Sequence, residues 1–181
     1  MKKIHNTKYK IHNTTHALRV IGIDPGTATT GWAVIGERAG KVIPLAYGHI
    51  STSAKKSTAQ RLKETADDIE KIVRKYKPQE ASVEDIFFFK NVKTAVKVSQ
   101  SRGAMLLTLE KLKVSIFEYT PLQIKQALTG YGRAEKKQIQ LMVKSILKLK
   151  TIPKPDDAAD AIAAAICHIN SRKINNLKDI S

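Results

Sequence analysis

The chain has 181 residues, of which 42% are hydrophobic, a formal net charge of +16 and a single cysteine, Cys167. This length predicts one domain around one hydrophobic core. A single cysteine excludes an internal disulfide, and no cysteine and histidine cluster has the spacing of a zinc site. No apolar run approaches the roughly 18 to 20 residues that cross a membrane, and the start lacks the apolar centre of a signal peptide, so we expect a cytoplasmic protein.

The positive charge points to a class of partner. A net charge of +16 is well above the magnitude of about 2 to 8 that keeps a small domain soluble. A surface this basic attracts polyanions over a Debye length of about 10 Å. No stretch has the basic helix with a bulky aromatic face that lies on membranes, so nucleic acid is the predicted partner.

Both ends of the chain differ in composition from its middle. Residues 1–17 contain four lysines and no acid, and they repeat the word Lys-Ile-His-Asn-Thr at 3–7 and 10–14. We expect a flexible basic arm there, whose histidines lack the scaffold that holds a metal ion. The domain itself is expected over residues 18–172, followed by a polar tail over 173–181.

The first half of the domain predicts strands and then a helix. Apolar runs over 18–23 and 31–36, separated by Asp24-Pro25-Gly26-Thr27, predict a hairpin, and 41–50 predicts a third strand. Ser57 and Gln60 fit a capping box, and apolar residues recur at helical spacing up to Pro78. This pattern predicts a helix over about 57–76.

The second half alternates strands with helices. The sequence predicts a strand over 81–88, a long helix over 91–113 and a strand over 114–119. Thr120-Pro121 is typical of a helix start, and further helices are predicted over 134–149 and about 157–170. Three antiparallel strands followed by this alternation predict a mixed α/β sheet with helices on its faces, and functional loops at strand ends.

Two acids interrupt apolar strands in the middle of the sequence. Asp24 follows the apolar residues 20–23, and Glu84 lies inside the run 82–87. A buried carboxylate without a partner is costly, so each acid requires a cation, hydrogen bonds or a function. Two plainer interpretations stay open: Asp24 starts a turn before Pro-Gly, and Glu84 faces water on an edge strand.

A third acidic element begins the last helix. Asp157 and Asp160 are three residues apart, on one helical face, among alanines that allow close packing against a sheet. They could simply complement the helix dipole, with Asp156 as the cap. Three close acids repel one another unless a cation lies between them. Carboxylate ligands suit Mg²⁺ or Mn²⁺, and two such ions about 3.5 to 4 Å apart are the arrangement for phosphodiester hydrolysis.

At these residues the sequence resembles the RuvC family of Holliday-junction resolvases, and the similarity extends from Leu18 to about His168. The matching words, in chain order, are Gly22-Ile23-Asp24-Pro25-Gly26-Thr27 with Thr30-Gly31; Val83-Glu84-Asp85-Ile86-Phe87 through Lys90-Asn91; Gln100-Ser101-Arg102-Gly103; Tyr119-Thr120-Pro121-Leu122-Gln123-Ile124-Lys125; Ala134-Glu135-Lys136-Lys137-Gln138-Ile139-Gln140; and Asp157-Ala158-Ala159-Asp160-Ala161. The resemblance implies an RNase H-like fold, a mixed five-stranded sheet flanked by helices.

The resemblance also implies an activity and its residues. Asp24, Glu84, Asp157 and Asp160 would bind two Mg²⁺ ions, with Mn²⁺ able to substitute, and cut four-way DNA junctions by paired symmetric nicks that leave 5′-phosphate ends. Phe87 would stack at the opened centre of the junction, although a phenylalanine in the apolar cluster 86–89 also fits a core position. The DNA contacts expected beside Phe87 are Lys90, Arg102, Lys125, Lys136 and Lys137.

The family acts as a homodimer, and a four-way junction has approximate two-fold symmetry, so a C₂ dimer presents two sites to two equivalent strands. The predicted helix over 91–113, with Ala95, Gly103 and Ala104 allowing close approach, is the candidate for part of the interface. The resemblance further implies the branch-migration proteins RuvA and RuvB as partners.

Two other classes of protein compete with this interpretation. Asp24-Pro25-Gly26-Thr27 with Gly31 also resembles the first phosphate loop of actin-like ATPases and sugar kinases. Those proteins need two such domains and a second Asp-x-Gly loop, and this sequence has neither. A DNA-binding module without activity agrees with the charge but leaves four acids unexplained.

Overall fold

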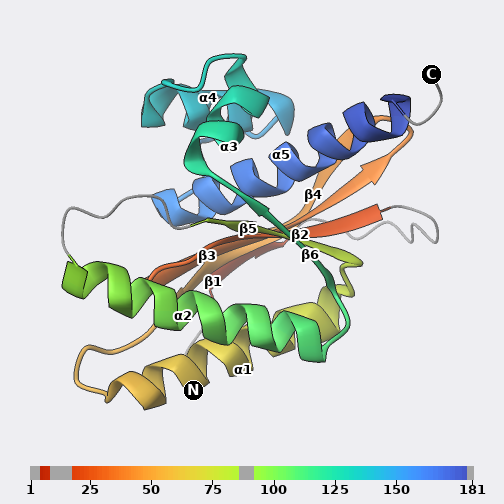
Figure 1. Ribbon diagram of the computed structural model, residues 1–181. Coiled ribbons are helices and arrows are strands. Elements are labelled where there is room, and N and C mark those ends of the chain that lie inside the picture. Colours follow the sequence, from red (N-terminus) through yellow and green to blue (C-terminus); the bar gives the residue numbers. More distant parts are fainter. Residues whose placement is uncertain (1–4, 9–17, 86–91, 179–181) are drawn as a thin grey trace.

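The computed structural model describes residues 5–8, 18–85 and 92–178, and it places them in one sheet with helices on both faces (Figure 1). The strands are β1 (His5–Lys8), β2 (Leu18–Asp24), β3 (Thr29–Arg38), β4 (Lys41–Ser51), β5 (Glu80–Glu84) and β6 (Ser115–Tyr119), in the order β1-β4-β3-β2-β5-β6. β2, β3 and β4 form an antiparallel meander, and β5 and β6 continue the sheet in parallel with β2. The predicted mixed α/β sheet is confirmed.

The helices divide between the two faces of the sheet. Helices α1 (Thr58–Tyr76) and α2 (Val92–Lys111) cover one face, and α3 (Pro121–Thr129), α4 (Lys136–Ile146) and α5 (Asp156–Lys178) cover the other (Figure 1). Ser57 and Thr120 cap α1 and α3 with the side-chain hydrogen bonds of a capping box. These two helices therefore begin where their sequence signals predict.

Alternating strand residues supply a core on each face of the sheet. On β2, Val20 packs into the core beneath α5, whereas Ile21 and Ile23 pack into the core beneath α1 and α2. Trp32 of β3, with none of its surface exposed, lies in the second core. Because successive strand residues point to opposite faces, one apolar run contributes side chains to both cores.

Two glycines let α5 lie directly on the middle strands. A Cβ atom at Gly22 would be 2.0 Å from the carbonyl oxygen of Ala161, and one at Gly31 would be 1.9 Å from that of Asp157. Only glycine allows backbones to approach this closely. The start of α5 is thereby held against the ends of β2 and β3.

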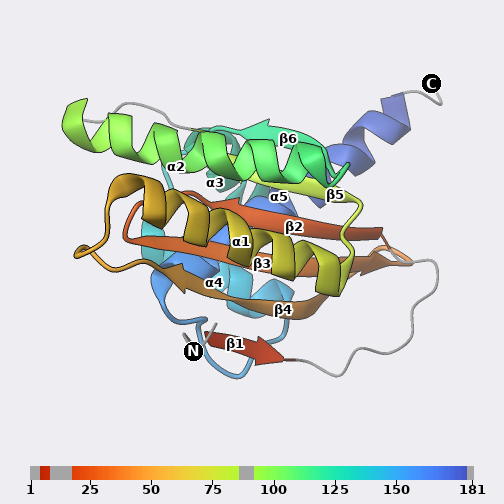
Figure 2. The same cartoon turned by 90° about the horizontal axis from the view of Figure 1, so that it is seen from below.

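The structure differs from the sequence prediction at both ends of the chain. Four residues of the expected flexible arm form β1, which pairs antiparallel with β4 from His5↔His49 to Lys8↔Ala46 (Figure 2). The outer edge of β4 offers free backbone groups that any extended segment can satisfy, and the arm's polar sequence gives no strand signal. α5 runs on to Lys178, so the expected polar tail from residue 173 begins inside a helix. None of the described helices is long and apolar enough to span a membrane.

Candidate active site

Asp24 and Glu84 lie next to each other at one edge of the sheet. Asp24 is the last residue of β2 and Glu84 the last of β5, and the two strands run parallel with Ile23 paired to Val83. β5 lies between β2 and β6, so Glu84 is not on an edge strand, and that plainer interpretation is wrong. The carboxyl ends of parallel strands are where α/β sheets form their sites.

The first turns of α5 bring two more acids to this edge. The helix begins at Asp156. Asp157 and Asp160 are three residues apart, so they lie on the same face of the helix. Asp157 is close to Asp24, because its backbone lies over Gly31 and Gly31 pairs with Asp24 in the sheet. Three elements remote in sequence therefore bring the predicted acids together.

Burial and mutual repulsion raise the pKa values of three of these acids in the metal-free protein. The pKa of Asp24 rises from 3.8 to about 8, first because of burial and then because of the charges of Glu84, Asp160 and Asp157. The pKa of Glu84 rises from 4.5 to about 7, first because of burial and then because of Asp160. Burial also raises the pKa of Asp160. Lys136 lowers both pKa values without restoring them, so the carboxylates carry more negative charge than the nearby lysines balance, as a cation-binding site does.

A cavity of about 250 Å³ opens between these acids and the helices α3, α4 and α5. Its lining residues are Asp24, Glu84, Pro121, Ile124, Lys125, Lys136, Ile139, Asp160 and Ala163. The wall thus joins carboxylates and two lysines to apolar side chains. Such a cavity suits an anionic ligand bound through a cation.

Lys136 is the cation that the acids contact in this structure. Its Nζ lies 2.9 Å from Oδ2 of Asp160 and 3.9 Å from Oδ2 of Asp156. As they stand, no three acid, histidine or cysteine side chains within the described part of the chain converge closely enough to hold a metal ion. The acids nevertheless offer only carboxylate oxygens, the donors that Mg²⁺ and Mn²⁺ prefer, so the chemistry of these side chains fits such ions.

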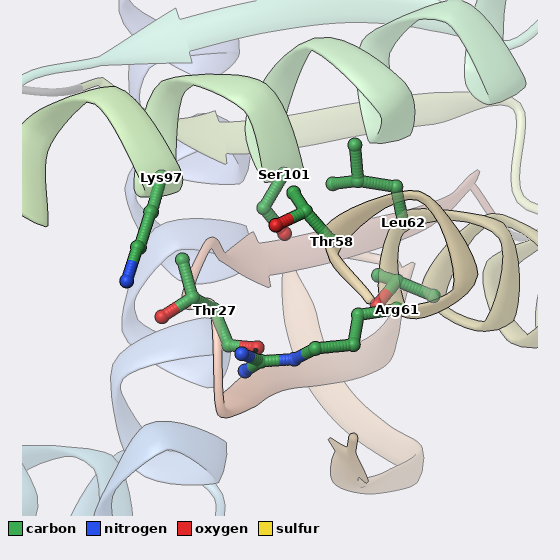
Figure 3. Close-up of a pocket in the computed structure, with 7 residues that line it drawn as sticks. Thr27, Thr58, Arg61, Leu62, Lys97 and Ser101 are labelled. Carbon is green, nitrogen blue, oxygen red and sulfur yellow. Dashed lines mark hydrogen bonds between the residues drawn. The ribbon is translucent and has the colours of Figure 1, made fainter. Parts of the chain in front are cut away.

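Three side chains remote in the sequence hydrogen-bond the turn after Asp24, and two of them belong to α1 and α2, on the face of the sheet opposite α5. Ser101 Oγ donates a hydrogen bond to the carbonyl oxygen of Gly26 at 2.9 Å, and Thr52 Oγ1 donates to that of Thr27 at 2.9 Å. The guanidinium of Arg61 also donates to the Thr27 carbonyl. Figure 3 shows Thr27, Arg61 and Ser101 meeting there from the turn, α1 and α2. The sequence gives no signal for these supports, because single polar residues on a helix or in a loop follow no periodic pattern.

The predicted DNA contacts have different surroundings. Lys125 and Lys136 line the cavity, and Lys137 is exposed at the start of α4. The guanidinium of Arg102 contacts the backbone of Glu84 and the carboxylates of Asp85 and Glu118, and its role as a DNA contact stays a prediction. The predicted contacts Phe87 and Lys90 lie outside the described residues.

Comparison with known proteins identifies the family. Residues 20–168 match the family model of the crossover junction endodeoxyribonuclease RuvC. The RuvC of Syntrophomonas wolfei is 48% identical over 164 residues, 91% of this chain and 95% of that protein, and the RuvC of Fusobacterium nucleatum is 52% identical over 154 residues, 85% and 81%. The structure of Thermus thermophilus RuvC in complex with a Holliday junction substrate superposes with a TM-score of 0.83 at 33% identity, covering 87% of this chain and 96% of that one. The chain therefore belongs to the RuvC family of crossover junction endodeoxyribonucleases.

Proposed function

We propose that the protein resolves four-way DNA (Holliday) junctions in recombination and repair by paired, symmetric nicks. The observation that carries this proposal is the meeting of Asp24, Glu84, Asp157 and Asp160 at one sheet edge, with the pKa of Asp24 raised to about 8. The net charge of +16 supports binding to a DNA backbone. Membership of the RuvC family supplies the substrate class, since its Thermus thermophilus member has been solved with a Holliday junction.

The four acids would hold two Mg²⁺ ions, or Mn²⁺ in their place. When bound, the ions supply an activated water and stabilise the leaving 3′ oxygen, which gives 5′-phosphate and 3′-hydroxyl ends. The raised pKa values of Asp24 and Glu84 support this assignment, because a divalent cation would offset both the burial and the repulsion that raise them.

The lysines of the cavity would then serve the substrate. Lys136 leaves Asp160 as the cation binds, and its ammonium becomes available to a phosphate at the mouth of the cavity. Lys125, on the α3 side of the same cavity, would hold the phosphate from the other direction. Ile124 and Ile139 keep part of the wall dry, which strengthens these charge interactions.

A homodimer would present two such sites to the two equivalent strands of a junction. The exposed face of α2 supports this part of the proposal: Val92, Val96 and Leu107 are 76%, 50% and 56% exposed and recur with Gly103 at helical spacing. Exposed apolar side chains along one helix face are typical of a helix–helix interface. RuvA and RuvB as partners rest on the family resemblance alone, and a cytoplasmic location rests on the sequence, which predicts neither a membrane span nor a signal peptide.

The activity is tested with a synthetic four-way junction and a linear duplex of the same sequence. We expect nicks at symmetric positions on two opposite strands of the junction in Mg²⁺. We expect no nicks in EDTA and none in the linear duplex. Junction binding without cleavage would make the protein a DNA-binding module, and ATP hydrolysis without cleavage would favour the actin-like ATPases.

A further inference from the structure

Two consecutive residues of α2 contact the two strand ends that carry Asp24 and Glu84. Ser101, only 3% exposed, donates to the carbonyl oxygen of Gly26 in the turn after Asp24 at 2.9 Å. Arg102 Nε donates to the carbonyl oxygen of Glu84 itself at 3.3 Å. One turn of a single helix is therefore bonded to both strand ends.

The guanidinium of Arg102 also balances two acids beside the site. Its side chain is 14% exposed, and Nη2 lies 3.2 Å from Oδ1 of Asp85 and contacts the carboxylate of Glu118. Asp85 follows Glu84 directly, and Glu118 precedes Tyr119, the residue of β6 that pairs with Glu84. Removing Arg102 would take away a positive charge that contacts both Asp85 and Glu118, beside Glu84.

Both polar groups of the peptide bond between Glu84 and Asp85 are hydrogen-bonded. The last β5–β6 hydrogen bond runs from the Asp85 N–H to the carbonyl oxygen of Tyr119 at 2.8 Å. Arg102 fixes the carbonyl oxygen on the other side of the same peptide bond. A side chain that fixes the peptide of a ligand orients that ligand, and the partners of metal ligands commonly contribute to affinity in this way.

From these contacts we propose that Ser101 and Arg102 act as a positioning brace, which sets the placement of Asp24 relative to Glu84 for metal binding. The inference rests on the proposed metal-dependent activity and deepens it. Neither residue contacts the substrate. Both act through the backbone, from the face of the sheet opposite the acids of α5, so the site is held from two sides.

The brace is tested by Mn²⁺ binding to the DNA-free protein, together with kcat and KM for junction cleavage. Arg102→Gln should lose Mn²⁺ affinity and kcat together by about 10-fold or more, the range typical of residues that orient metal ligands. Arg102→Lys keeps the charge but not the planar guanidinium, so its Mn²⁺ affinity and kcat should lie between those of the parent and those of Arg102→Gln. Ser101→Ala should lose about 3-fold, because it removes one neutral hydrogen bond. Junction affinity in Ca²⁺ should change less than about 2-fold for each variant.

The matched control is Lys111→Gln, which removes one positive charge from an exposed position in the last turn of the same helix. It should keep the parental Mn²⁺ affinity. If Arg102→Gln kept parental Mn²⁺ affinity and lost junction binding with a shallower salt dependence, Arg102 would be a phosphate contact and the brace would be wrong. A lower thermal midpoint with parental Mn²⁺ affinity and kcat in the folded protein would reduce Arg102 to a packing residue. A parent that binds Mn²⁺ without nicking junctions would refute the proposed function alone, whereas one that binds no Mn²⁺ would overturn the brace as well.

Discussion

Replacing Asp24 by asparagine should stabilise the metal-free protein, by an amount that grows with pH. In the unfolded chain this carboxyl loses its proton near pH 4, whereas in the folded protein it keeps the proton up to about pH 8. Between these values the folded state binds more protons than the unfolded state, so the free energy of unfolding falls as pH rises and levels off above about pH 8. Each pKa unit corresponds to about 1.4 kcal/mol, so the charge costs the metal-free fold on the order of a few kcal/mol at pH 8.5.

Urea unfolding in EDTA measures this cost, with the buried Trp32 as the fluorescent probe. The gap between Asp24→Asn and the parent should widen by a few kcal/mol from pH 5 to pH 8.5. Glu110→Gln, a change at an exposed acid of α2, is the control and should show a constant, small gap. Mg²⁺ should reverse the order at pH 8.5, because it stabilises only the protein that binds it. If Asp24→Asn were instead less stable than the parent by about 0.5 to 2 kcal/mol at every pH, Asp24 would be a simple turn or cap residue.

Three further variants test other parts of the site. Changing Lys136 and Lys137 together to alanine should weaken junction binding and flatten its salt dependence by up to about two units of slope, and an unchanged slope would make both ordinary surface lysines. Phe87→Ala should lose cleavage with little loss of stability if Phe87 stacks on a base, whereas a much lower melting temperature with normal cleavage by the folded fraction would place it in the core. Gly31→Ala should cost about 1 to 3 kcal/mol in thermal unfolding and weaken Mn²⁺ binding, because its Cβ would push on Asp157; parental values for both would contradict the close contact.

The acids at the strand ends could be identified from the sequence, because a charged side chain at the end of an apolar run is costly to bury. An acid at the end of an apolar run stands out, as do two acids at helical spacing among alanines, so Asp24, Glu84, Asp157 and Asp160 could be selected without coordinates. The residue pattern does not contain the strand order. Only the pairing of β5 between β2 and β6 decides that Glu84 is not an edge residue facing water.

Contacts between segments remote in the sequence could not be predicted either, because they also depend on how the strands and helices are arranged in space. Nothing in the local pattern distinguishes a lysine that reaches Asp160 from one that reaches solvent, yet Lys136 does the first and Lys137 is exposed. Arg102 is a second example. The family resemblance implies a DNA contact there, and nothing in the sequence indicates that its guanidinium also contacts the Glu84 backbone and two acids.

The most direct test of the account measures binding and cutting separately for Asp24→Asn and Glu84→Gln. Junction affinity is measured in Ca²⁺ and nicking of the same junction in Mg²⁺, beside the parent. Because phosphate affinity comes mainly from the basic surface, both variants should bind the junction as tightly as the parent or more tightly. Both should lose most of their cleavage, because each lacks one of the carboxylates expected to hold the ions. If either variant nicked at close to the parental rate, that residue would not be a metal ligand and the four-carboxylate site would have to be redrawn.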